Sequence, residues 1–138
     1  NLGVFKLMGQ NILTNIRIKE MSIFIKIGAT EYNSAEYEIP AERTFRDGWE
    51  ANSDTGVISV NMDKAKDIWR DKIRQARVEP LAALDKAYMK ALETSADTTQ
   101  IIADKQALRD APSLASIDAA STVDELKAIQ PIPNFLVE

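Results

Sequence analysis

The motif Asp-Thr-Gly at residues 54–56 is the part of the sequence that comes closest to a catalytic signature. In acid proteases this motif carries one of two buried aspartates that share a single proton. A hydrophobic strand leads into that aspartate, whereas Asn52 and Ser53 precede it here, and the sequence holds no second copy. Asn, Ser and Asp side chains hydrogen-bond to nearby backbone, and Gly56 tolerates a positive φ. We therefore expect a hairpin turn over residues 52–56 and no protease site.

Other catalytic and metal-binding chemistry lacks its usual side chains. The sequence contains no histidine and no cysteine, which removes the commonest proton-transfer group, the commonest metal ligand and every thiol. The NSDTG stretch lacks the spaced acids of a calcium loop, and no Gly-rich phosphate loop or Gly-x-Ser-x-Gly elbow occurs. We expect a non-enzymatic protein with no catalytic, cofactor-binding or metal-ligating residues and no cofactor.

A basic stripe is the remaining pattern that could bind a charged ligand. Four cationic side chains recur at spacings of four, four and three residues: Lys66, Arg70, Arg74 and Arg77. An aspartate lies three residues before each of the first three: Asp63, Asp67 and Asp71. Such pairs support a helix by about 0.2–0.5 kcal/mol each and cancel the local field. With a net charge of −4, a self-paired solvated face is favoured over an acidic partner or nucleic acid.

The elements that must position these residues begin with extended chain up to about residue 60. NIRIK at 15–19 and MSIFIKI at 21–27 alternate apolar and polar residues, as half-buried strands do. The second places four apolar residues on one face: Met21, Ile23, Ile25 and Ile27. The parity of the apolar positions changes near Glu20, which predicts a bulge or turn there. A candidate strand at 35–39 and two segments flanking the predicted turn, 43–50 and 56–60, complete a β-meander.

From Asn61 the apolar period becomes helical, and Asn61 itself is a good N-cap. One stripe steps by three or four residues: Ala65, Trp69, Ile73, Ala76, Pro80, Leu84, Tyr88 and Ala91. Its phase continues through Pro80, which favours one long helix over 62–94, kinked where proline removes a hydrogen bond. Two helices broken at Glu79 remain the alternative, since the residue before proline resists helical geometry.

Two shorter helices follow. The pattern predicts an antiparallel helix over 99–111 that stops at Pro112, and a short helix over 121–129. The second carries a capping box, in which Thr122 and Glu125 satisfy amides at the helix end. The fold class is therefore α+β, with a β-rich segment at 1–60 and a helical hairpin, short helix and extended tail at 61–138, forming one cooperative domain at this chain length.

The predicted helices differ in length, which leaves apolar surface without cover. At 1.5 Å per residue the helix over 62–94 is about 50 Å long and its partner about 20 Å. The first half of the apolar stripe and the C-terminal tail therefore need cover from the β-rich half or another chain. We expect partner contacts at five residues in an oligomer or larger assembly: Trp69, Ile73, Phe135, Leu136 and Val137.

The N-terminal residues allow more than one interpretation. No apolar run approaches the roughly 20 residues that span a bilayer, so no membrane span is expected. Residues 1–20 fit an edge segment that packs on its own domain or a neighbour, with a membrane-surface helix as the alternative. Met21 is a candidate original start, which would make residues 1–20 an extension.

Several helical segments carry a resemblance to a known group of proteins. They are KAKDIWRDKIRQAR followed by LAALD, then KQALRDAP and ELKAIQP, with IPAERTFRDGW upstream. Over about residues 39–131 the chain resembles small tail-region proteins of tailed bacteriophages, described as tail assembly chaperone-like or tail-fibre-assembly-like. The resemblance implies a virion tail component or assembly factor, with other tail proteins as partners. It would be located in the virion tail, or in the bacterial host cytoplasm during assembly. The alternative is a small regulatory module that binds nucleic acid through the basic stripe.

Overall fold

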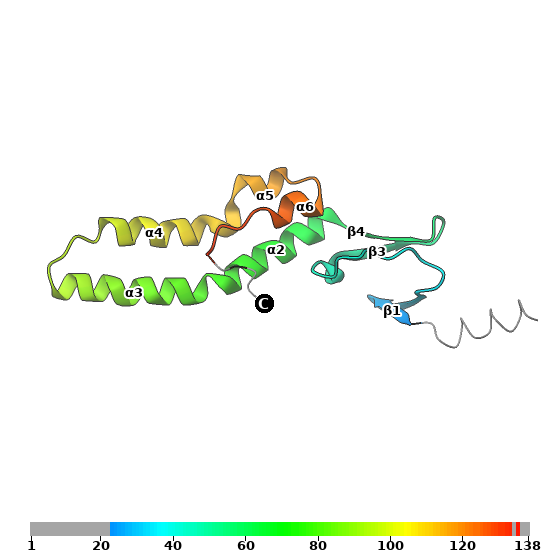
Figure 1. The fold of residues 1–138 in the computed structure, drawn as a ribbon, viewed down its shortest axis with the longest axis horizontal. Helices are drawn as coiled ribbons and strands as arrows, with labels where there is room; N and C mark the ends of the chain where they lie inside the picture. Colours follow the sequence, from blue (N-terminus) through cyan, green and yellow to red (C-terminus); the bar gives the residue numbers. More distant parts are fainter. Residues whose placement is uncertain (1–22, 134, 136–138) are drawn as a thin grey trace, which may run out of the picture. The chain divides into compact units, whose positions relative to one another are not determined.

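The computed structural model describes residues 23–133 and residue 135. The chain forms two compact units, residues 1–60 and 61–138, which are treated separately below. Short antiparallel strand pairs make up the first, and a long bent helix followed by shorter helices makes up the second (Figure 1). The predicted α+β class is confirmed.

In its described part, residues 23–60, the first unit forms two separate two-stranded sheets rather than one continuous meander. Strand β1 (Phe24–Ile27) pairs antiparallel with β2 (Thr30–Asn33), and β3 (Trp49–Asn52) pairs antiparallel with β4 (Val57–Val60). The 3-10 helix η1 (Arg46–Gly48) leads directly into β3.

Two strand predictions in this unit need correction or fall outside the description. The strand predicted at 35–39 is wrong, because only a single bridge between Glu38 and Val57 forms there. The strand predicted at 15–19 and the bulge near Glu20 lie outside the described residues.

The described residues of the first unit form a small core. Three buried residues form its core, one from each of three strands: Ile25, Trp49 and Ile58. Partly buried side chains pack around them, including Ile27, Tyr32 and Tyr37, and the two tyrosine rings meet edge to face with centroids 5.2 Å apart. Ile25 and Ile27 thus face inward as predicted, whereas Ile23 is 72% exposed.

The predicted hairpin turn between β3 and β4 is present. The Asn52 side-chain oxygen accepts hydrogen bonds from the backbone N–H groups of Asp54 (3.0 Å) and Thr55 (3.3 Å). Gly56 has a φ of 66°, and a Cβ at this position would lie 3.2 Å from the Glu36 carbonyl oxygen. Both the left-handed backbone and the close approach explain why glycine occupies this corner.

The second unit begins with the long bent helix. Helix α2 (Met62–Ala76) is followed by α3 (Val78–Glu93), and Asn61 caps α2 by accepting from the Lys64 N–H at 3.1 Å. The chain bends at Arg77, three residues before the predicted kink at Pro80. Proline has no N–H to donate to the carbonyl four residues earlier, and its ring crowds that carbonyl, so the distortion falls one turn before the proline.

After α3 the chain forms α4 (Thr99–Asp110), which lies beside α3 in an antiparallel hairpin (Figure 1). Three short elements follow: η2 (Ala111–Ser113), α5 (Ala115–Ala119) and α6 (Val123–Lys127). The sequence did not predict α5. The capping box of α6 is confirmed, because the Glu125 N–H donates to the Thr122 hydroxyl at 3.2 Å and the Thr122 N–H donates to the Glu125 carboxylate at 3.3 Å.

The core of the second unit lies around α2. Its fully buried members come from α2, α5 and α6: Ala65, Trp69, Ile73, Ile117 and Leu126. Helix α2 contacts η2 and α6, so the segment after α4 returns to cover it. The Trp69 indole N–H donates to the Ile129 carbonyl at 2.9 Å, and the Phe135 ring stands edge to face against the indole at 4.8 Å between centroids.

Candidate functional site

Two of the predicted partner-binding residues are not available for contact. Trp69 and Ile73 have no exposed surface, so the expectation that they need cover from another chain is wrong. The chain after residue 110 provides that cover through η2, α6 and the Ile129 carbonyl. Phe135 is partly buried against Trp69. Leu136 and Val137 lie outside the described residues.

The cationic side chains of the basic stripe on α2 form ion pairs and hydrogen bonds within the chain. Arg74 pairs with Asp71 at 2.5 Å, and Arg70 pairs with both Asp67 (3.0 Å) and Asp118. Lys66 donates to the Asp118 carbonyl at 2.8 Å. Arg70 and Arg74 thus pair with the aspartates three residues before them, as the spacing predicted. Asp118 of α5 is an additional partner that the sequence pattern did not reveal.

The fourth member of the stripe has a structural role. The Arg77 guanidinium donates to the Arg109 carbonyl at 2.7 Å and lies 3.4 Å from the Leu108 carbonyl. These carbonyls belong to the last turn of α4, where backbone oxygens lack helical partners and a cation is favourable. Arg77 therefore ties the bend of the long helix to the end of α4.

The carboxylates do not assemble into a reactive or metal-binding site. Asp54 is exposed on the hairpin turn, far from the buried paired geometry of an acid protease. In the part of the chain that the structure describes, no group of three or more acidic side chains could hold a metal ion. Within the same residues, no helix is both long and apolar enough to cross a membrane.

Hydrogen bonds shift the pKa of two exposed carboxyl groups. The Thr99 hydroxyl, followed by the Thr99 N–H, lowers the pKa of Asp97 at the start of α4. The Ser121 N–H and then its hydroxyl lower the pKa of Glu125 in the capping box. Both carboxylates accept bonds from groups at helix N-termini, where a negative charge is stabilised. These shifts reflect helix capping rather than acid–base chemistry.

The hairpin of α3 and α4 has a thin interior. Its only buried side chains among the described residues are Ala91 and Leu108. Lys105 of α4 pairs with Asp85 of α3 at 2.5 Å, and its ammonium lies 5.2 Å from the centre of the Tyr88 ring. A cation with an 85% covered side chain thus occupies a position between the two helices where an apolar residue would be usual.

A second face of α3 carries the largest exposed apolar side chains of the helical unit. Val78 is 63% exposed, Met89 57% and Leu92 52%. With Ala82 and Asp85 they follow alternating steps of four and three residues, the spacing of a helix face that packs on another helix. We call these five residues the α3 strip.

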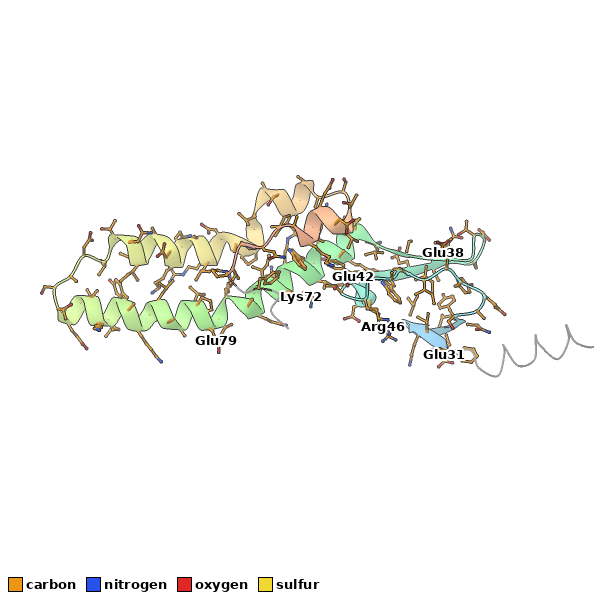
Figure 2. The ribbon with its side chains drawn as sticks, in the orientation of Figure 1. Glu31, Glu38, Glu42, Arg46, Lys72 and Glu79 are labelled. Carbon is orange, nitrogen blue, oxygen red and sulfur yellow. The ribbon has the colours of Figure 1, made fainter. Side chains whose placement is uncertain are left out.

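Charged residues border the α3 strip. Glu79 projects from the side of α3 away from α4 (Figure 2). A shallow hollow beside Met89 is lined by Asp85, Lys86, Lys90 and Glu93 as well. Apolar side chains with a charged rim resemble the organisation of protein–protein contact surfaces.

Sequence reasoning missed the α3 strip. It followed the stripe through Leu84, Tyr88 and Ala91, which faces α4. The four-three spacing through Val78, Met89 and Leu92 was visible in the sequence, but two apolar faces on one helix cannot be ranked without knowing where the partner helix lies.

Comparison with known proteins identifies no relative. No family model matches the chain, and neither curated proteins nor solved structures give a match.

Proposed function

We propose that this protein is a non-enzymatic component or assembly factor of a bacteriophage tail that acts through protein–protein contacts. The proposal rests on the resemblance of the helical segments between about residues 39 and 131 to small phage tail-region proteins. It places the protein in an oligomer or larger assembly with other tail proteins, in the virion tail or in the host cytoplasm during assembly.

The observation that supports contact with another subunit is the α3 strip. Three large apolar side chains on one helix face are each more than half exposed: Val78, Met89 and Leu92. Complete burial of such a side chain stabilises an association by roughly 1.5–3 kcal/mol. Because each side chain is more than half exposed, a partner could still contribute more than half of this stabilisation. Met89 and Leu92 are neighbours on this face, and exposed apolar surface with a charged rim is typical of interaction sites.

The arrangement of polar groups supports a contact role over catalysis. The cations of the basic stripe bind acidic groups and carbonyls of the same unit, and the two shifted carboxyl groups cap helices. None of these groups faces another across a cleft in the described residues, as an acid and a base must.

Co-expression with phage tail proteins tests the proposal. A tagged chain should retain at least one tail subunit, and the double variant Met89→Ser, Leu92→Ser should retain about tenfold less. Leu114→Ser is the matched control, because Leu114 is also exposed but lies between η2 and α5, outside the α3 strip. Recovery of no tail subunit, together with a monomeric chain, would refute the proposal.

Mass spectrometry of purified virions separates the two versions of the proposal. A structural component is present in stoichiometric amounts, whereas an assembly factor is found in infected cells and is absent from mature particles.

A further inference from the structure

Strand β1 has an edge whose backbone groups find no strand among the described residues. Ile27 and Thr30 close a two-residue loop, in which Gly28 has a φ of 61°. Residue pairs in an antiparallel ladder alternate between hydrogen-bonded and non-hydrogen-bonded, so Ile25, like Ile27, exchanges hydrogen bonds with β2. The Ser34 N–H donates to the Ile23 carbonyl at 2.9 Å, which continues this alternation. The N–H and C=O groups of Phe24 and Lys26 therefore point away from β2.

The side chains at this edge are apolar at one end. Ile23 is 72% exposed and Phe24 is 60% exposed. Ile25, the next residue along the strand, faces the core. A two-stranded sheet is marginally stable in isolation, and an added strand would satisfy the open backbone groups and cover Phe24.

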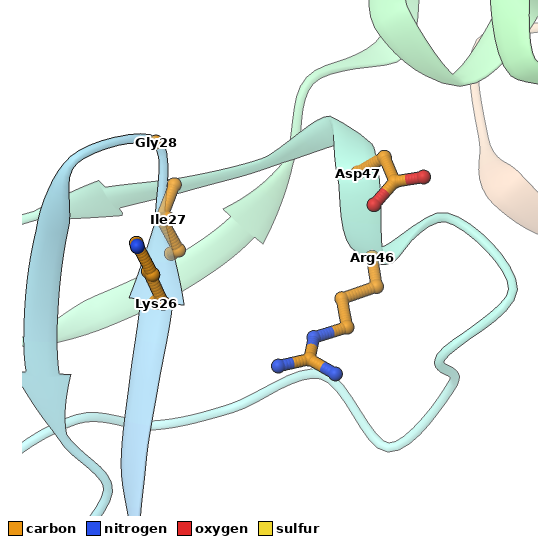
Figure 3. A pocket seen from close by; sticks show the side chains of 5 residues that line it. All are labelled: Lys26, Ile27, Gly28, Arg46 and Asp47. Carbon is orange, nitrogen blue, oxygen red and sulfur yellow. The ribbon is translucent and has the colours of Figure 1, made fainter.

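The other end of the edge is cationic. An open hollow of about 370 Å³ is lined by Lys26, Ile27, Gly28, Arg46 and Asp47. Arg46 lies on the side of β1 away from β2 (Figure 3). No ion pair joins Lys26 or Arg46 to a carboxylate in the described part of the chain, and Glu31 is the residue opposite Lys26 in the strand pair. The charged side chains that line the hollow itself are two cations and one acid. The charge favours a ligand with a carboxylate.

We propose that the outer edge of β1 accepts an extended acidic segment of a partner protein as a third, antiparallel strand. Side chains directly opposite each other in such a pair lie on the same face. In the partner segment, the residues opposite Ile27, Ile25 and Phe24 are apolar. The residue opposite Lys26 is Asp or Glu, held between Lys26 and Arg46. The order along the partner is thus apolar, acidic, apolar, apolar. This edge belongs to a different unit from the α3 strip, so the inference does not depend on the proposed function.

A labelled synthetic peptide, Ser-Gly-Val-Glu-Val-Phe-Gly-Ser, provides a direct probe. Titration with the full chain, followed by fluorescence anisotropy, should give saturable binding. Replacing the Glu of the peptide with Lys should weaken binding at least about tenfold. The double variant Lys26→Glu, Arg46→Glu should reverse this preference, which a merely unfolded variant would not do.

Backbone methylation tests whether the peptide binds as a strand. N-methylation of the peptide Glu or Phe blocks a hydrogen bond to β1 and should abolish binding. N-methylation of the Val between them falls on the outward side and should leave binding within about twofold. Equal loss at all three positions would overturn strand addition.

Two further outcomes would overturn the proposal. One is the absence of binding at about 1 mM chain, which is weaker than specific peptide recognition. The other is self-occupancy of the edge, in which case the native chain binds no peptide. Lys26→Pro, which removes an outward N–H and leaves the bonds to β2 in place, would then lower the thermal stability of the chain. That result would assign the edge to the chain's own NIRIK segment, residues 15–19, instead of a partner.

Discussion

The two halves of the long bent helix are covered very differently. Helix α2 buries Ala65, Trp69 and Ile73 completely, whereas α3 buries only Ala91 and exposes the α3 strip. The cause is the path of the chain after α4, since η2 and α6 return to α2, whereas α4 is the one helix that packs along α3 in the described residues. The number of elements that pack on a helix thus decides its exposure, and an apolar stripe alone does not.

The largest expected effect is at the covered half. Trp69→Ala should lower the free energy of unfolding by about 3–5 kcal/mol, because it empties a packed site and removes the hydrogen bond to the Ile129 carbonyl. Urea unfolding followed by circular dichroism measures this. Met89→Ala on α3 is the matched control and should cost less than about 0.5 kcal/mol. Similar losses for the two variants would contradict the contrast between α2 and α3.

The capping box tests how firmly α6 is held over α2. Thr122→Ala should cost about 1 kcal/mol, since the Glu125 N–H loses its acceptor. A smaller cost near zero would mean that packing of Leu126 alone holds α6 in place.

The same cap makes a prediction about pH. Hydrogen bonds lower the pKa of Glu125 in the folded chain, so its stabilisation is complete above the ordinary glutamate pKa and is lost as the pH falls through the lowered value. The difference in melting temperature between the native chain and Glu125→Gln should therefore shrink between about pH 6 and pH 3. A difference that grows on acidification would contradict the assigned direction.

The ion pair between α3 and α4 tests what stabilises the less buried half of the long helix. Asp85→Asn should cost about 0.5 kcal/mol at low salt, because Lys105 has a mostly covered side chain while Asp85 is exposed. The effect should disappear near 1 M salt, where the Debye length is about 3 Å. A cost that persists in high salt would indicate a hydrogen-bonding role instead.

The smallest expected effect on stability is at the α3 strip. Met89→Ser and Leu92→Ser should each change the free energy of unfolding by less than about 0.5 kcal/mol, as typical surface substitutions do. A loss above about 2 kcal/mol would show that these side chains are buried in the isolated chain, and would remove the α3 strip as a contact surface.

Local sequence signals predicted local structure well. Asn52 and Gly56 define the hairpin turn, Asn61 starts α2, and Thr122 with Glu125 caps α6. Each signal acts through a hydrogen bond or backbone angle within a few residues, so no knowledge of the remaining chain is needed. The bend was predicted as well, but its place shifted from Pro80 to Arg77 because a proline acts on the preceding turn.

Features that depend on distant residues were not predictable. The cover over Trp69 comes from elements about forty to sixty residues later in the chain, and α5 consists of five residues without a side-chain cap. Asp118 meets Lys66 and Arg70 only because α5 returns to α2. The edge of β1 likewise follows from register and from the position of Arg46, which no spacing in the sequence reveals.

The link from Arg77 to the end of α4 has a mechanical consequence. The guanidinium joins the bend of the long helix to the last turn of α4, so the antiparallel helices α3 and α4 are tied together at the end opposite their connecting loop. The 16 residues of α3 make a lever of roughly 24 Å, measured from that joint. The guanidinium therefore holds the base of this lever against the end of α4.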